Sequence, residues 1–180
     1  MAKYTGKIYL AGSDKARLAD CRVRIVKESD PMEPCDNADL VFEKADDESL
    51  IPADALFKWN IMLPGGRQWF YTTAERCKQM VSEDPSYWTK EKLEEFARIE
   101  GRFYRDWRDG NVYGYVVETW DNAQRMWKTT SSAYGMYGAD ELLENVKDIV
   151  AKYKYEPIVC IDEELKYDFD NTEKQPNEFK

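Results

Sequence analysis

The sequence predicts an α+β fold, with a mainly antiparallel sheet and about three helices in a single domain. Strand-like segments come first, followed by two helical segments, a hairpin, a third helix and a last strand. This order contains few of the strand–helix–strand alternations that build parallel sheets. The chain has 180 residues, of which 43% are hydrophobic, so it is long enough to bury a core without disulfides. We expect one domain over residues 1–170 and a flexible tail at 171–180.

The first quarter of the chain predicts two strands, at residues 8–11 and 21–27. The second strand alternates basic and apolar side chains, as a half-buried strand does. The segment that follows, residues 28–54, is bounded by prolines and contains a single short apolar run at 40–42. We expect this segment to be a long surface excursion with one strand in it.

The middle of the chain predicts two strands within residues 56–71, which meet at a turn formed by Pro64-Gly65-Gly66. A capping-box pattern, Thr72-x-x-Glu75, then precedes a short helix with one apolar face. From Thr89 to Arg108, large apolar residues recur at spacings of three and four, which predicts a long helix.

The last third predicts a hairpin, a helix and a strand. Residues 112–120 and 125–131 are rich in β-branched and aromatic side chains and flank a short polar turn. A segment with two glycines, residues 134–138, then predicts a tight turn, with anion binding at the helix start as the alternative interpretation. Residues 140–152 have the period of a helix, and residues 155–161 read as a strand.

The net charge of −9 is concentrated in one region. Residues 28–54 hold ten carboxylates against Lys44 alone, whereas residues 1–27 hold seven bases against two acids. An acidic surface of this kind could mimic DNA phosphates and attract a basic protein. The alternative is a solvated loop that keeps the protein soluble.

The composition also limits the chemistry. There is no histidine, which is the commonest general base and metal ligand near neutral pH. The four cysteines lie far apart in the chain, and neither a calcium loop nor a phosphate-binding glycine pattern is complete. We therefore expect no catalytic residues, no metal and no cofactor. The sequence has no export signal or membrane span, which predicts a cytoplasmic protein with no membrane partner.

The candidate partner-binding residues are eight carboxylates and two tryptophans. They are Glu33, Asp36, Asp39, Glu43, Asp46, Asp47, Glu48, Asp54, Trp59 and Trp69. The tryptophans, together with Tyr71, Tyr87 and Trp88, could form either an interface or part of the core. The expected partner is a protein with a basic nucleic-acid-binding surface, bound without direct contact to nucleic acid.

Glu100 is the candidate for a perturbed carboxylate. If the apolar stripe of its helix runs through Leu93, Phe96 and Phe103, Glu100 points toward the core, where desolvation would raise its pKa. If the stripe instead runs through Ala97 and Tyr104, Glu100 lies at the margin of the core.

Residues 107–118, followed by a serine and two glycines at 131–138, resemble a pattern found in small uncharacterised proteins of phages and mobile elements. The resemblance covers about a sixth of the chain, and this chain has Ser132, Ala133 and Tyr134 where those relatives usually carry a cysteine and a tryptophan. Small acidic phage proteins are often inhibitors of host defence. The resemblance therefore implies a non-catalytic inhibitor of a host protein that handles nucleic acid.

Two other functions stay open. Residues 7–13 resemble the opening strand of nucleoside deoxyribosyltransferase-like proteins, and residues 35–42 loosely resemble their second strand, which implies a small nucleoside- or nucleotide-processing enzyme. The glycine-rich segment with the nucleophilic glutamate of that family is absent. The third reading is an assembly protein that self-associates through the aromatic residues from Trp59 to Trp88.

Overall fold

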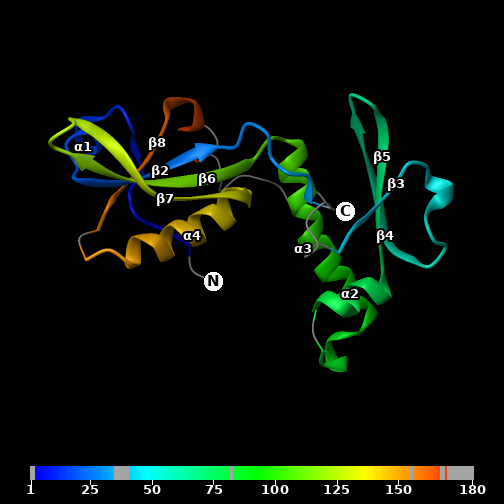
Figure 1. Cartoon of the computed structure of the whole chain (residues 1–180). Helices are drawn as coiled ribbons and strands as arrows, with labels where there is room; N and C mark the ends of the chain where they lie inside the picture. Colours follow the sequence, from blue (N-terminus) through cyan, green and yellow to red (C-terminus); the bar gives the residue numbers. More distant parts are fainter. Residues whose placement is uncertain (1–2, 35–40, 82, 155, 167–168, 170–180) are drawn as a thin grey trace. The chain divides into compact units, whose positions relative to one another are not determined.

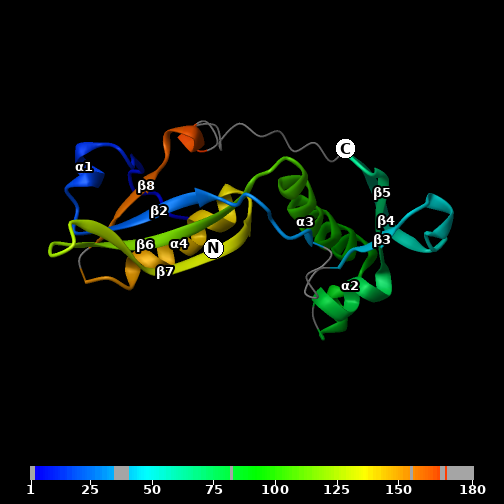
Figure 2. The same ribbon diagram turned by 45° about the horizontal axis from the view of Figure 1, so that its top comes forward.

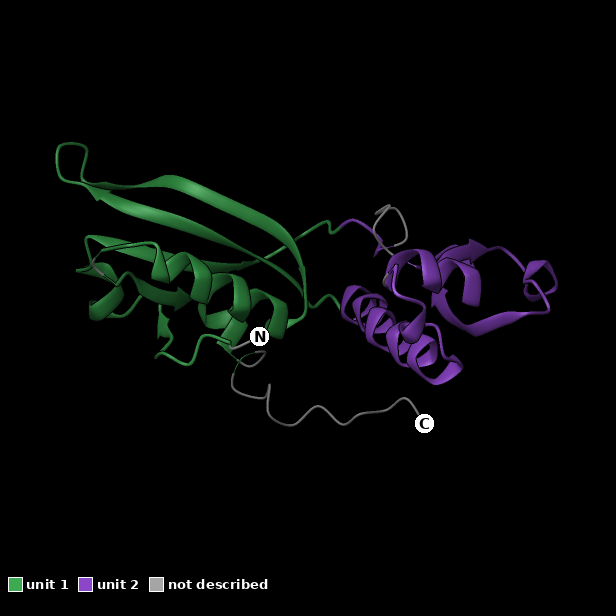
Figure 3. Ribbon diagram, turned by 90° about the horizontal axis from the view of Figure 1, so that it is seen from below, with its two compact units in different colours: residues 1–31, 110–178, 180 green, residues 32–109, 179 purple. Residues whose placement is uncertain are grey.

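The protein is described by a computed structural model covering residues 3–34, 41–81, 83–154, 156–166 and 169. It confirms the α+β class, with two mainly antiparallel sheets and three substantial helices. The described residues divide into two compact units (Figure 3). Unit 1 contains the described residues of 1–31 and 110–178, and unit 2 contains those of 32–109. The sequence predicts one domain, whereas each unit has a hydrophobic cluster of its own.

Unit 1 is built on a five-stranded sheet with the strand order β1-β8-β2-β6-β7. The strands are β1 (Tyr9–Leu10), β2 (Cys21–Lys27), β6 (Val112–Asp121), β7 (Met126–Tyr137) and β8 (Ile158–Ile161). Strand β8 runs parallel to β1 and β2, and the other pairs are antiparallel. The helical segments are α1 (Asp14–Arg17), α4 (Ala139–Ala151) and η4 (Glu163–Leu165).

Helix α4 lies along one face of this sheet (Figures 1 and 2). Val23 and Ile25 of β2 are fully buried in the same cluster as Leu142 and Val146 of α4. The alternation expected for a half-buried strand is thus confirmed for β2, because its apolar residues meet the helix and its arginines lie on the other face.

Unit 2 is built on a three-stranded antiparallel sheet with the order β3-β5-β4. Its elements are β3 (Glu43–Ala45), η2 (Glu48–Leu50), β4 (Ala55–Leu63), β5 (Gly66–Thr73), α2 (Ala74–Val81), η3 (Pro85–Tyr87) and α3 (Lys90–Arg108). The predicted turn after β4 is confirmed, and Gly66 has a φ of 125°, which favours glycine. The hydroxyl oxygen of Thr89 accepts from the Lys92 amide at 3.4 Å and caps α3 where the sequence predicts its start.

The core of unit 2 is a group of aromatic rings. Trp59 stacks on Phe70 with ring centroids 4.7 Å apart, and Phe42 and Tyr104 meet the Trp59 ring edge-on. Val41 and Phe42 are buried here, so the acidic segment is built into the fold instead of being only a surface excursion. Its strand is residues 43–45, because Val41 and Phe42 lie ahead of the β3 ladder. Residue 40 lies outside the described residues.

The hairpin of unit 1 is longer than the sequence predicts. Strand β7 continues through Gly135 to Tyr137, where a turn is expected, and two register shifts absorb the extra residues. The amide of Gly135 donates to Glu28 Oε2 at 2.9 Å, and its φ of 80° suits glycine. The expected tail at 171–180 lies outside the described residues.

Candidate partner-binding surface

The sheet of unit 2 has α2 and α3 on one face (Figure 1). The other face carries the acidic connection, which is the segment of residues 46–54 between β3 and β4. Strands β3 and β4 lie at opposite edges, so the connection between them has to cross the sheet. Lys58 Nζ holds Glu48 Oε1 at 2.8 Å, and the register places Lys58 beside Tyr71. The connection therefore crosses the face that carries Tyr71, away from the aromatic core.

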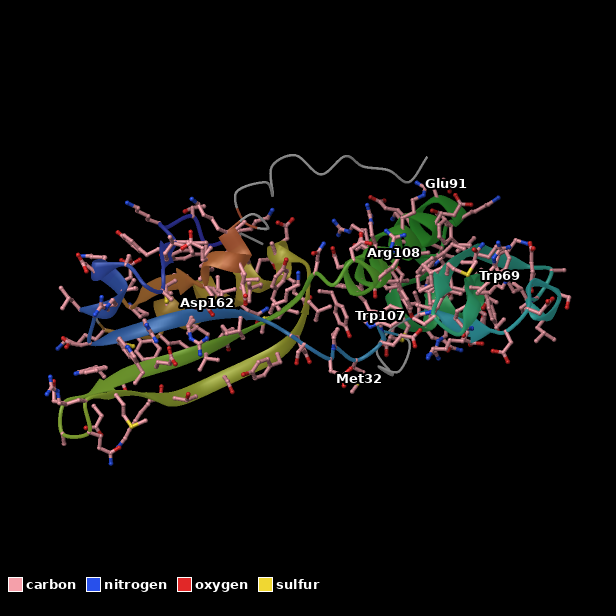
Figure 4. All side chains as sticks on the ribbon, turned by 90° about the horizontal axis from the view of Figure 1, so that it is seen from above. Met32, Trp69, Glu91, Trp107, Arg108 and Asp162 are labelled. Carbon is pink, nitrogen blue, oxygen red and sulfur yellow. The ribbon has the colours of Figure 1, made fainter. Side chains whose placement is uncertain are left out.

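Two half-exposed aromatic residues of β5 lie on this outer face. Tyr71 pairs with Glu43 across the ladder, and its hydroxyl donates to Glu43 Oε2 at 2.8 Å. Trp69, labelled in Figure 4, pairs with Ala45 and Asn60. We call this surface the acidic face and define it by Glu43, Asp46, Asp47, Glu48, Asp54, Trp69 and Tyr71.

Local contacts fix some carboxylates of the acidic face and leave others in solvent. Asp47 accepts the Ser49 amide at 2.8 Å, which caps η2 and lowers the pKa of this carboxyl. The Tyr71 hydroxyl has a raised pKa, first because of its hydrogen bond to Glu43. Asp46 and Asp54 are exposed, and neither has an ion pair or hydrogen bond to another described residue.

The remaining predicted partner residues fall elsewhere. Glu33 is half-buried, with Lys44 Nζ 2.6 Å from its Oε2. Asp36 and Asp39 lie outside the described residues. Trp59 belongs to the core stack, because it lies directly opposite the buried Phe70 in the ladder and directly opposed residues share a face of the sheet. Trp69 alone of the two tryptophans reaches the acidic face.

Glu100 lies at the margin of the core of unit 2. The buried stripe of α3 runs through Leu93, Ala97, Gly101 and Tyr104, and Glu100 is half-buried. The fully buried positions thus follow the alternative stripe through Ala97 and Tyr104, while Phe96 and Trp107 pack against the core as partly buried residues. Burial is the first cause of the raised pKa of the neighbouring Cys77 thiol, and Glu100 adds to the shift.

A second charged cluster lies in unit 1, on the sheet face opposite α4. Arg22 Nε donates to Glu118 Oε2 at 2.8 Å, and Arg24 Nε approaches the same oxygen at 3.3 Å. Arg24 also reaches Asp162 Oδ2 at 3.3 Å, and the Asp162 label lies beside β2 in Figure 4. The Arg22 guanidinium lies 4.0 Å from the centre of the Trp127 ring.

This cluster acts as an internal ion network. Arg22 and Glu118 are both at least nine-tenths buried, so each charge depends on its partner. Cys160 lies beside it, and burial raises the pKa of its thiol to about 11, which keeps it protonated and unreactive near neutral pH. Sequence analysis missed the network because the pairing of Arg22 with Glu118 depends on strand register, although the alternation of β2 signals the arginines.

Two further observations concern metal ligands and membrane spans. In the described part of the chain, no three His, Cys, Asp or Glu side chains gather in a way that could hold a metal ion. None of the described helices combines the length and the apolarity needed to cross a membrane.

The described parts of the two segments that resemble deoxyribosyltransferase-like proteins belong to different units. Strand β1 pairs with β8 in unit 1, whereas Val41 and Phe42, the described end of the second segment, pack in the core of unit 2. The nucleoside- or nucleotide-processing function stays a prediction.

Comparison with protein-family models, curated proteins and solved structures finds no match to this chain.

Proposed function

We propose that this chain is a non-catalytic binding protein whose acidic face docks onto the basic, nucleic-acid-binding surface of another protein. The observation that carries the proposal is the acidic connection itself, which presents Asp46, Asp47, Glu48 and Asp54 beside the half-exposed rings of Trp69 and Tyr71. Carboxylates supply charge complementarity, and aromatic side chains supply the contact area that dominates many interfaces.

The local contacts of the acidic face favour binding over mere solubility. Asp47 is fixed by its cap to Ser49, and Glu48 is held by Lys58. Groups already held in one geometry lose less conformational entropy when a partner binds. A solvated loop would need no such order.

The partner class follows from charge and from the resemblance to phage and mobile-element proteins. A groove that binds DNA carries lysines and arginines spaced to meet phosphates, and exposed carboxylates can meet the same side chains. We infer that the protein competes with nucleic acid for a host defence protein in the cytoplasm and so inhibits it.

The test is capture of a partner on the tagged chain from nuclease-treated host lysate, followed by elution with salt and, separately, with double-stranded DNA. We expect a basic protein that elutes as salt rises, because screening weakens exposed charge pairs. DNA should release the same protein at low salt. A partner that resists both salt and DNA would contradict the proposal, and so would the capture of no nucleic-acid-binding protein.

A further inference from the structure

We propose that strand β7 is a homodimerisation edge, which pairs antiparallel with β7 of a second copy about a two-fold axis between Thr130 and Ser131. The first observation is topological. Strand β7 is 12 residues long and lies at one edge of the sheet, whereas β1 at the other edge has two residues. A long edge strand presents unpaired N–H and C=O groups to any strand that can reach it.

The second observation is chemical. From Thr129 to Tyr137 the strand contains neither a charged residue nor a proline, both of which protect edge strands from pairing. The antiparallel self-pairing places Lys128 opposite Ala133 of the second copy. Lys128 Nζ is also neutralised by Asp121 Oδ2 at 2.5 Å. No like charges therefore meet across the pairing, which favours a second copy as the occupant.

The third observation is that the self-pairing keeps side chains on matching faces. Residues directly opposite in an antiparallel pair share a face, and a regular strand changes face at every residue. In β7 the register shift between Val117 and Glu118 leaves Thr130 as an extra residue. Thr129, opposite Glu118, and Ser132, opposite Val116, consequently lie on the same face of the sheet. They can then meet across the two-fold axis.

The aromatic residues at the two ends of this segment fit the same register. Trp127 lies on the face of Arg22, and the Tyr134 ring lies over Gly114, whose Cβ position would fall 2.5 Å from it. Gly114 and Glu118 are on one face of β6 by alternation, so Trp127 and Tyr134 share that face. The pairing places Trp127 opposite Tyr134 of the second copy and covers a ring that is 54% exposed.

The experiment is sedimentation velocity of the full chain over about 1 to 100 µM, since the average molecular mass of a reversibly dimerising protein rises with its concentration. We expect a dimer that persists in about 1 M salt, because backbone hydrogen bonds and apolar contacts are little affected by screening. A chain that stays monomeric throughout would overturn the proposal.

A matched pair of double variants tests the register. Thr129→Lys with Ser132→Lys places like charges opposite each other twice per dimer and should weaken dimerisation by about tenfold or more. Thr129→Lys with Ser132→Glu places opposite charges there and should leave the dimer intact. Circular dichroism checks that both variants fold. If the two variants dimerise equally well, the β7 pairing is wrong, whatever the acidic face binds.

Discussion

The two units build their cores from different side chains. Unit 1 packs mostly β-branched and aliphatic residues, together with Tyr113 and Tyr115, against α4, whereas the centre of unit 2 is a group of four rings, Phe42, Trp59, Phe70 and Tyr104. A wide sheet offers many inward positions that medium-sized side chains can fill. A narrow sheet offers few, so each must bury more area. The smaller unit therefore depends more heavily on each of its rings.

The units also use charge differently. The carboxylate of Glu118 in unit 1 is buried between two arginines, while those of Asp46 and Asp54 in unit 2 face solvent. Buried charges contribute to stability only through their partners, whereas exposed charges contribute little to it and stay available for binding. We therefore expect substitutions in unit 1 to change folding and charge substitutions on the acidic face to change binding.

The largest expected effects come from core truncations. Phe70→Ala should destabilise unit 2 by about 3–5 kcal/mol, and Leu142→Ala should destabilise unit 1 by about 2–5 kcal/mol. Each unit contains its own reporter, because Cys77 is buried in unit 2 and Cys160 in unit 1. In a chain that also carries Cys21→Ser and Cys35→Ser, only Cys77 and Cys160 remain, and thiol labelling measures the exposure of each.

The comparison predicts selective labelling. Phe70→Ala should expose Cys77 first, and Leu142→Ala should expose Cys160 first, while the parent background labels slowly at both. If either truncation exposed both thiols at the same rate, the two units would unfold together in one cooperative step, and they would not be independent units of stability.

The next largest effect separates buried from exposed ion pairs. Glu118→Ala should cost about 3–5 kcal/mol, because it leaves the buried Arg22 guanidinium without its carboxylate. Glu48→Ala breaks an ion pair whose side chains are about half exposed and should cost about 0.2–1 kcal/mol. Denaturant unfolding measures both. Equal losses would contradict the assignment of Glu118 to an internal network.

Much of the fold follows from patterns within single segments. The start of α3 and the turn between β4 and β5 depend on local residues such as Thr89 and Gly66, and both are predicted. The course of β7 past Gly135 depends on bulges against β6, and the Arg22–Glu118 pair depends on register. Long-range pairing fixes these features, so local periodicity does not show them.

The same limit applies to the candidate surface. The acidity of residues 28–54 is visible in the sequence. The sequence does not show which of these carboxylates form ion pairs or hydrogen bonds within the folded chain. Glu33 meets Lys44 because the fold brings the two together. Trp59 lies on β4 and Trp69 on β5, an even number of residues apart. Within one strand such a spacing would place both on the same face, but the turn between the strands sets the register and leaves only Trp59 facing the core.

The smallest expected effect is the pH dependence of the Tyr71 hydroxyl. Its hydrogen bond to Glu43 exists only while the phenol is protonated, and the pKa is raised above 10.0 in the folded chain. The stabilisation should be present below pH 10.0 and should be lost as the pH rises through the raised pKa. Tyr71→Phe should remove one late-titrating phenol from the tyrosinate absorbance curve. If the substitution instead removed a phenol that titrates near the ordinary tyrosine pKa, the hydrogen bond between Tyr71 and Glu43 would be contradicted.

The most direct test compares two triple variants that remove the same charge from different units. Asp46→Asn, Asp47→Asn and Glu48→Gln alter the acidic face, and Asp148→Asn, Glu163→Gln and Glu164→Gln alter exposed residues of unit 1. Affinity of each for the captured basic partner is measured at one salt concentration. We predict at least about a tenfold loss for the first variant and little change for the second. Equal losses would mean that net charge alone drives binding, and no loss in either would contradict the acidic face as the binding surface.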